Sequence, residues 1–195
     1  MSEIKDFFDK LAPSWDDGAK GKENEIKALL GRLGIKKGDD VLDLACGTGV
    51  ITSYLHDLSS NDVTGLDLSP KMIEMAKRKY LDKPWAHFEV GDFLSWSSLK
   101  LFDFIVVYNA YPHFLDPKVL SSCLAKKLRN GGKFAIVHSL GRKELDKHHS
   151  NVPCSISRNL LSPQEEALNF ADGFKIDLTE EGENFYLLRG VKLGA

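Results

Sequence analysis

The chain has 195 residues, 43% hydrophobic and 28% charged, a composition typical of one folded domain with a buried core. Its 26 basic and 28 acidic residues give a net charge of −2, without the basic surplus that proteins gripping nucleic acid phosphates usually carry. No apolar run approaches the roughly 20 residues of a membrane span. The three widely spaced cysteines fit neither a disulfide framework nor a paired-thiolate zinc site.

The N-terminal segment, MSEIKDFFDKLAPSWDD, is charged and lacks the apolar stretch of a secretory signal, so a cytoplasmic location is expected. Trp15 follows Ala12-Pro13, a loop signal, and stands outside the strand and helix pattern. Trp15 is either a core residue, a wall of an acceptor pocket or part of a lid, and its place after a loop signal favours the lid.

Five short segments next have the length and composition of strands, and the continuous apolar one resembles a strand buried on both faces. Helical segments alternate with them, an order that predicts an open parallel sheet with helices on both faces. The five strand segments are residues 40–44, 62–67, 86–90, 104–108 and 133–138.

Two of the intervening helices have clear start signals. Ser69-Pro70 and Asp116-Pro117 each place a capping residue before a proline at the first helical position. Asn130-Gly131-Gly132 predicts the turn that ends the second of these helices. Its predicted buried face consists of Val119, Leu120, Cys123, Leu124 and Leu128.

The tail departs from this alternation. Residues 174–178 and 185–191 predict a hairpin around the polar turn 179–184, and residues 139–172 are mixed, with helices expected at 142–150 and after Ser162-Pro163. The predicted fold is α/β: a doubly wound, mostly parallel seven-stranded sheet with a C-terminal antiparallel hairpin. We expect a single domain over residues 1–195, with a cofactor-binding core at 38–138 and a substrate-side segment at 139–195.

The segment VLDLACGTG, residues 41–49, joins the first strand to its helix, where open α/β sheets bind ligands. Gly47 and Gly49 permit a tight turn, and the following helix offers free N–H groups. A dinucleotide motif would need a third glycine where Thr52 stands, and the P-loop lysine is absent. Asp43 suits a ligand with positive ammonium and sulfonium groups better than a pyrophosphate.

Acidic residues also end the next two strands. Asp67 lies 18 residues after Gly49, where a carboxylate can accept both hydroxyls of a ribose. Asp92 could accept a hydrogen bond from an adenine amino group while Phe93 or Leu68 covers the ring. Either aspartate alone could be a cap or turn residue, so their joint occurrence after successive strands carries the prediction.

The order and spacing of these motifs resemble the class I methyltransferases that depend on S-adenosyl-L-methionine (SAM). The opening FFDKLAPSWDD is also similar to the first helix of the menaquinone and ubiquinone C-methyltransferase branch, where that helix folds over the cofactor, which implies a helical lid over residues 1–37. The resemblance covers residues 38–138 and rests on VLDLACGTG, GLDLSPKMI, VGDF, FDFIVVYNAYPHF and LRNGGKFAIV.

The resemblance implies a role for each matching position. Asp43 would orient the network around the methionine part of SAM, above the turn of Gly47 and Gly49. Asp67 would take the ribose hydroxyls and Asn109 would contact the amino-acid part or face the acceptor. The family usually has glycine where this chain has Ala45, which implies a slightly altered turn. The complete predicted cofactor-binding set is Asp43, Ala45, Cys46, Gly47, Gly49, Asp67, Leu68, Met72, Asp92, Phe93 and Asn109.

Catalytic candidates follow the fourth strand. His113 is the first candidate for a general base, and the alternative is a structural histidine that caps the helix beginning near Asp116. Tyr108 and Tyr111 are the next candidates, although Tyr108 could equally line the core. A base is needed only if the acceptor must lose a proton.

No metal site is expected. His138, His148 and His149 are candidate ligands, but His148 and His149 are adjacent, so on a helix their side chains point about 100° apart and a metal shared by that pair alone is not expected; a substrate-facing helix is the preferred interpretation. Cys46 is interpreted as a small packing residue, since methyl transfer from SAM needs no covalent enzyme intermediate.

The sequence therefore predicts a SAM-dependent methyltransferase that moves a methyl group to a small-molecule acceptor by in-line displacement and releases S-adenosyl-L-homocysteine (SAH). No nucleic acid or membrane partner is expected, and the chain is expected to be a monomer or homodimer. The alternatives are a SAM-binding regulatory module without transfer activity, an RNA or protein methyltransferase, and a nucleotide-binding oxidoreductase, which the missing third glycine opposes.

Overall fold

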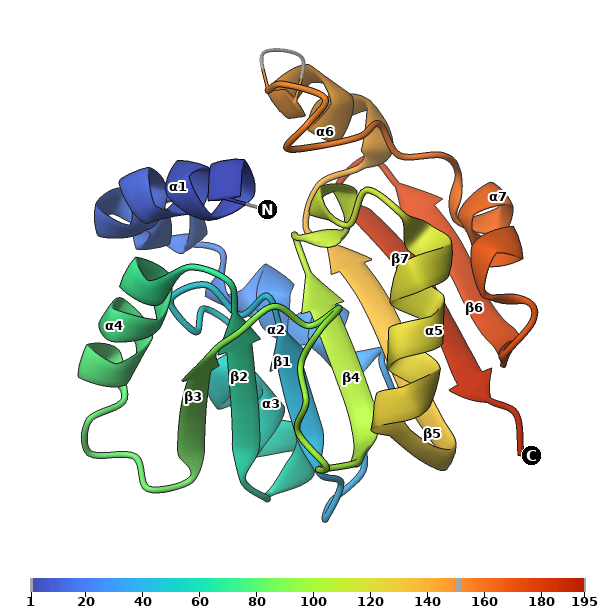
Figure 1. The fold of residues 1–195 in the computed structure, drawn as a ribbon, viewed down its shortest axis with the longest axis horizontal. Helices are drawn as coiled ribbons and strands as arrows, with labels where there is room; N and C mark the ends of the chain where they lie inside the picture. Colours follow the sequence, from blue (N-terminus) through green and yellow to red (C-terminus); the bar gives the residue numbers. More distant parts are fainter. Residues whose placement is uncertain (1, 150–151, 195) are drawn as a thin grey trace. The chain divides into compact units, whose positions relative to one another are not determined.

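A computed structural model describes residues 2–149 and 152–194 of the chain (Figure 1). The chain divides into two compact units, Met1–Ser98 and Leu99–Ala195, a division that the sequence did not predict. Among the described residues, no helix combines the length and the apolar character required to cross a bilayer.

The first unit contains three parallel strands in the order β3-β2-β1. Val63 of the central strand lies opposite Val41 on one side and Ala86 on the other. Parallel neighbours need crossover connections, and α3 and α4 provide them. The elements are β1 (Val41–Leu44), α3 (Thr52–Ser59), β2 (Val63–Asp67), α4 (Pro70–Lys79) and β3 (Ala86–Val90).

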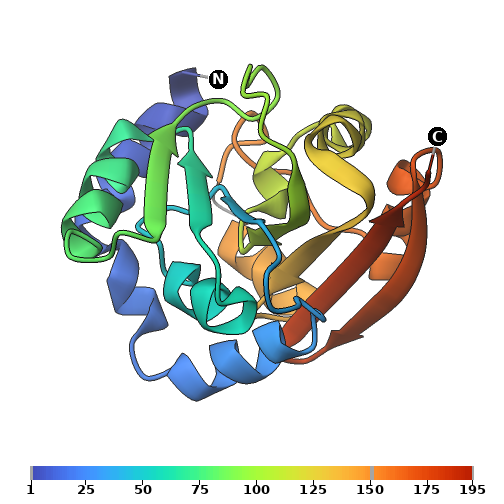
Figure 2. The ribbon, with the colours of Figure 1, turned by 90° about the horizontal axis from the view of Figure 1, so that it is seen from below.

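Residues before β1 are largely helical, as predicted. Figure 2 shows α2 beside α3, and Figure 1 shows α1 beyond the carboxyl ends of β2 and β3, next to the start of α4. These elements are α1 (Ser2–Leu11), the 3₁₀ helix η1 (Ala12–Ala19) and α2 (Glu23–Gly31).

The second unit contains four strands in the order β4-β5-β7-β6. β4 and β5 are parallel, whereas β7 runs antiparallel to both of its neighbours. The strands are β4 (Phe102–Tyr108), β5 (Leu128–His138), β6 (Phe174–Gly182) and β7 (Phe185–Lys192). The helices are η2 (Tyr111–His113), α5 (Pro117–Lys127), α6 (Arg142–His149), α7 (Pro163–Ala167) and η3 (Leu168–Phe170).

The predicted fold class is confirmed: seven strands, mostly parallel before the tail, end in an antiparallel hairpin. Both predicted helix caps are present as well. The Ser69 hydroxyl accepts a hydrogen bond from Met72 N, and the Asp116 carboxylate accepts bonds from the first turn of α5. Cap signals act over three residues, which is why local sequence identifies them.

Three details differ from the prediction. β5 begins at Leu128, whose partner is Phe102, so the three residues expected to end the helix lie inside a strand. A register shift between Phe102 and Phe104 accommodates them, with Gly131 in a left-handed conformation. Val119 is 43% exposed and does not belong to the buried face of α5. The hairpin strands extend further than predicted and leave only residues 183–184 between them.

Candidate cofactor site

In the glycine turn after β1, three alternate residues adopt the left-handed backbone conformation. Ala45, Gly47 and Gly49 have φ angles of 55°, 55° and 76°. The amide of Cys46 donates to Leu66 O (3.1 Å), and the amide of Gly49 donates to Cys46 O (2.9 Å), so the turn is fastened to β2 and to itself. A Cβ atom at Gly49 would lie 2.9 Å from Tyr80 Cε2. Glycine is therefore required there by conformation and by space.

Ala45 occupies a conformation that glycine adopts without strain. We expect Ala45→Gly to raise the free energy of unfolding by roughly 0.5–1 kcal/mol, because a left-handed alanine costs about 1 kcal/mol or more and the entropy of an unfolded glycine offsets only part of it. Denaturant unfolding of both proteins measures the difference. A variant less stable than the parent would show that the Ala45 side chain makes packing contacts worth more than the strain.

Asp43 of β1 is a buried carboxylate, 1% exposed, that accepts a 2.6 Å hydrogen bond from Thr52 Oγ1. Burial raises the pKa of Asp43 to about 7, against the hydrogen bond from Thr52 and assisted by the charge of Asp67. A buried carboxylate with this environment gains from a nearby cation, because the cation offsets the cost of its desolvated charge.

Asp67 ends β2 and holds two backbone segments together. Its Oδ2 atom accepts from Gly47 N and its Oδ1 atom from Ser69 N, each at 2.8 Å. The residue is partly exposed, and burial of its carboxyl raises the pKa of Asp67 despite both hydrogen bonds. An ionised carboxylate has about four acceptor positions, so Asp67 retains capacity for ligand hydroxyls.

Two aspartates of the N-terminal segment, which the sequence analysis missed, tie that segment to the turn. The Asp16 carboxylate accepts a hydrogen bond from Thr48 Oγ1 and forms an ion pair with Lys79 Nζ (2.6 Å). Asp9 accepts from Ser69 Oγ (2.5 Å) and Lys71 N (3.2 Å) at the start of α4.

Trp15 lies against the same turn. A Cβ atom at Gly47 would be only 3.1 Å from Trp15 Nε1, and the Trp15 ring packs edge-on against Phe8 at 5.6 Å. This placement is compatible with the predicted lid, and the lid role itself stays a prediction.

Tyr80 is a further residue that the motifs did not reveal. Its hydroxyl donates to Gly49 O (2.7 Å) and accepts from Ser53 N (3.2 Å), so it joins the glycine turn to the first turn of α3. Cys46 packs in the same cluster with Ile73, Ala76, Tyr80 and Phe88. Burial raises the pKa of the Cys46 thiol well above its ordinary value, which agrees with a packing role.

Asp92 and the remaining adenine-side candidates lie in the same unit. Both Asp92 carboxylate oxygens accept local hydrogen bonds, from Leu94 N and from Ser95 Oγ, each at 3.1 Å. Asp92 thus forms a turn, and its contact with adenine stays a prediction. Met72 and Phe93 are buried, whereas Leu68 is partly exposed.

Asn109 and Tyr108 end β4 in the second unit. Asn109 is left-handed (φ 52°), a conformation that asparagine tolerates. Its Nδ2 atom donates to Ser139 Oγ (3.0 Å), and its Oδ1 atom accepts from Ser139 N (2.9 Å), so it fastens the end of β4 to the residue after β5. Tyr108 is partly exposed.

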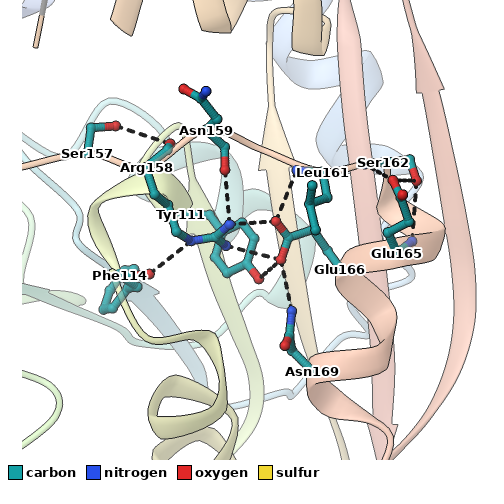
Figure 3. A network of polar contacts seen from close by, with 10 residues as sticks. All are labelled: Tyr111, Phe114, Ser157, Arg158, Asn159, Leu161, Ser162, Glu165, Glu166 and Asn169. Atoms are coloured by element: carbon teal, nitrogen blue, oxygen red, sulfur yellow. Dashed lines mark hydrogen bonds and ion pairs between the residues drawn. The ribbon is translucent and has the colours of Figure 1, made fainter. Parts of the chain in front are cut away.

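Tyr111 does not fit the predicted role of a base. The residue is fully buried, and its hydroxyl donates a 2.6 Å hydrogen bond to Glu166 (Figure 3). Burial and the negative charge of Glu166 raise the pKa of Tyr111, which opposes the loss of its proton. The apolar ring and the tethered hydroxyl make it part of the core.

His113 is not the helix cap that the alternative interpretation suggested, because Asp116 caps α5. Its Nδ1 atom instead lies 2.9 Å from Ile156 O, and the residue is partly exposed. His113 therefore stays the first candidate base.

Metal ligands do not gather in the part of the chain that the structure describes: it contains no group of three or more suitable side chains. His138 is buried, with its ring edge-on to Tyr186 at 5.7 Å. The side chains of His148 and His149 lie outside the described residues.

Comparisons with known proteins point to one class. Residues 41–132 match the family model described as "Methyltransferase domain". A malonyl-[acyl-carrier protein] O-methyltransferase of Anoxybacillus flavithermus is 26% identical over 153 residues, 77% of this chain and 57% of that protein. A demethylmenaquinone methyltransferase of Lactobacillus johnsonii is 36% identical over 84 residues, 40% of this chain and 34% of that protein. The chain spans about half the length of the curated relatives it matches.

A solved structure extends the likeness to nearly the whole chain. A chain of the solved "Complex between the Haloferax volcanii Trm112 methyltransferase activator and the putative methyltransferase" superposes with a TM-score of 0.79 at 25% identity, over 96% of this chain and 98% of that one. These matches confirm the predicted resemblance to the class I SAM-dependent methyltransferases, the class whose cofactor is SAM. The match to the menaquinone enzyme is too short to single out that branch.

Proposed function

We propose that this protein transfers the methyl group of SAM to a small-molecule acceptor. The observation that carries the proposal is the arrangement of one unit: two acidic side chains, Asp43 and Asp67, lie at the ends of adjacent strands around a left-handed glycine turn. SAM carries a cationic part and ribose hydroxyls. Asp43 is suited to the cation and Asp67 to the hydroxyls, and Gly47 and Gly49 leave two positions of the turn without side chains.

The residues present fit that cofactor. Asp43 is buried, it accepts its hydrogen bond from the neutral hydroxyl of Thr52, and its pKa is raised, so a positive ligand group beside it would stabilise its charged form. At Gly47 a Cβ atom would crowd Trp15, so the indole can approach the backbone of the turn only because that position is glycine. Asp67 would hold the ribose, and Trp15 would exclude water from above the turn.

When bound, SAM supplies a methyl group already activated by its positive sulfur. The work left to the chain is positioning, exclusion of water and, for an acceptor that must lose a proton, a base. His113 is the residue we assign to that last task, since Tyr111 is buried and bonded to Glu166.

The small-molecule acceptor is supported by composition rather than by relatives. The net charge of −2 does not favour a polyanionic acceptor. The names of the relatives mention acceptors as different as a malonyl-carrier protein and demethylmenaquinone, so they do not decide the acceptor.

Incubation with SAM labelled in its methyl group and a metabolite extract tests the proposal. We expect label to appear in a low-molecular-mass product. The incubation is run with and without added Trm112 protein, because a neighbouring structure is a complex with that activator. Label in RNA or protein fractions alone would contradict the small-molecule acceptor. Tight SAM binding without transfer to any fraction would favour the regulatory module instead.

A further inference from the structure

A buried cluster in the second unit joins Tyr111 to residues of segment 158–169, which lies outside every motif that predicted the site (Figure 3). Its centre is Glu166 of α7, whose side chain is fully buried. Burial opposes the charge of Glu166, but hydrogen bonds from Arg158 and Tyr111 outweigh it and lower the pKa of the carboxyl. The carboxylate accepts from Tyr111 Oη (2.6 Å), Arg158 Nη1 and Nη2 (2.6 and 3.1 Å), Leu161 N (3.1 Å) and Asn169 Nδ2 (3.1 Å).

Arg158 connects this carboxylate to η2. Its guanidinium pairs with both oxygens of Glu166 and lies over the Tyr111 ring, 4.5 Å from the centroid. Its Nε atom donates to Phe114 O at 3.3 Å, directly after η2. A planar guanidinium can make these contacts at once, whereas the ammonium of a lysine cannot.

The segment 153–158 is thereby fastened along η2 at three points. Arg158 N donates to Pro112 O (3.0 Å), Arg158 Nε donates to Phe114 O, and Ile156 O meets His113 Nδ1 at 2.9 Å. Within the segment itself, a turn joins Ile156 N to Pro153 O (2.8 Å). The position of Ile156 O therefore depends on the attachment of Arg158.

The contact with Ile156 determines which nitrogen of His113 carries the hydrogen. A carbonyl oxygen can only accept, so Nδ1 must donate, and the lone pair of the neutral imidazole then lies on Nε2. We propose that Arg158 and Glu166 are positioning residues that hold segment 153–158 against η2 and so keep His113 in the Nδ1–H tautomer, with Nε2 as its proton-accepting atom.

The consequence for catalysis rests on the proposed function. As the lone pair of an acceptor oxygen or nitrogen bonds to the methyl carbon, the electron pair of the carbon–sulfur bond stays with sulfur. The acceptor proton passes to Nε2 of His113. The imidazolium that forms has two N–H donors, and Ile156 O already accepts from one of them.

Long-range proton–nitrogen NMR of the full chain with ¹⁵N-labelled histidine reads the tautomer directly, without substrate. His113→Gln assigns the signal, and spectra are taken at a pH where the imidazole is neutral. We expect wild-type His113 to show a protonated Nδ1 and an unprotonated Nε2. An Nε2–H signature in the wild type would overturn the assignment whatever the variants do.

Arg158→Lys and Glu166→Gln test the positioning role. We expect the His113 nitrogen signals of each folded variant to shift toward a mixture of the two tautomers. Tyr111→Phe, which keeps the ring under Arg158 and removes one bond to Glu166, should give a smaller shift. Arg189→Lys is the matched control, because Arg189 pairs with Asp177 on the hairpin and should leave His113 unchanged.

Unchanged His113 signals in all three cluster variants would overturn the positioning role. SAH binding measured on the same samples separates this inference from the proposed function. Binding with the wrong tautomer would refute the inference alone, whereas the expected tautomer without SAH binding would refute the function alone.

Discussion

Asp43→Asn will make the ligand-free protein more stable at alkaline pH and will weaken SAM binding. The pKa of the wild-type carboxyl is raised by burial from 3.8 to about 7. The stability that its proton supplies is complete below the unfolded value and is lost as the pH rises through about 7. An asparagine does not titrate, and its side-chain oxygen can accept the same hydrogen bond from Thr52.

The stability difference should therefore grow between about pH 4 and pH 7 and level off above it. The shift from 3.8 to about 7 corresponds to at most ~4 kcal/mol. We expect the free energy of unfolding to rise by only about 2 kcal/mol, because the NH2 group of the asparagine would be buried without a hydrogen-bond acceptor. Denaturant unfolding at several pH values measures it. A difference that does not change with pH would contradict the raised pKa of Asp43.

The same variant should lose cofactor affinity by ~10-fold or more, since a neutral amide cannot offset the charge of an ammonium group. Asp62→Asn is the matched control. Asp62 precedes β2 at the opposite end of the strand from the turn, and its carboxylate makes an exposed 3.1 Å contact with His87 Nε2. Calorimetry with SAH should show normal affinity for that control. Equal losses in both variants would point to a general effect of charge.

Asp67→Ala is expected to reduce both binding and stability. It removes the acceptor for Gly47 N and Ser69 N and the group that we assign to the ribose. We expect SAM affinity to fall by ~10-fold or more, and the free energy of unfolding to fall by about 2 kcal/mol because two backbone donors lose their partner. Calorimetry and denaturant unfolding measure the two effects separately.

Asp62→Ala is again the control, expected to leave SAM affinity unchanged and to alter stability by less than about 0.5 kcal/mol because its contact with His87 is exposed. Unchanged SAM affinity in Asp67→Ala would remove Asp67 from the binding site. Unchanged stability would show that water replaces its two hydrogen bonds at the turn.

Local chemistry explains which features were predictable. Ser69 and Asp116 cap helices through residues two or three positions away. The turn after β1 was predictable because Gly47 and Gly49 adopt left-handed conformations without strain. The strand ends follow from hydrophobic runs, so Asp43 and Asp67 could be placed before the fold was known.

Contacts distant in sequence were not predictable. Glu166 lies 55 residues from Tyr111, and nothing near either residue indicates that the hydroxyl will be buried against that carboxylate. Asp16 meets Thr48 across 32 residues for the same reason. Val119 has the spacing of a buried residue, but α5 covers the sheet with a narrower face than its apolar pattern suggests.

We propose that the chain binds SAM at the turn between Asp43 and Asp67. Calorimetric titration of the full chain with SAM, SAH and NAD tests it most directly. We predict saturable binding of SAM and SAH, weakened in both aspartate variants, and no binding of NAD. Folded protein that binds neither SAM nor SAH, or that binds NAD in their place, would contradict the claim.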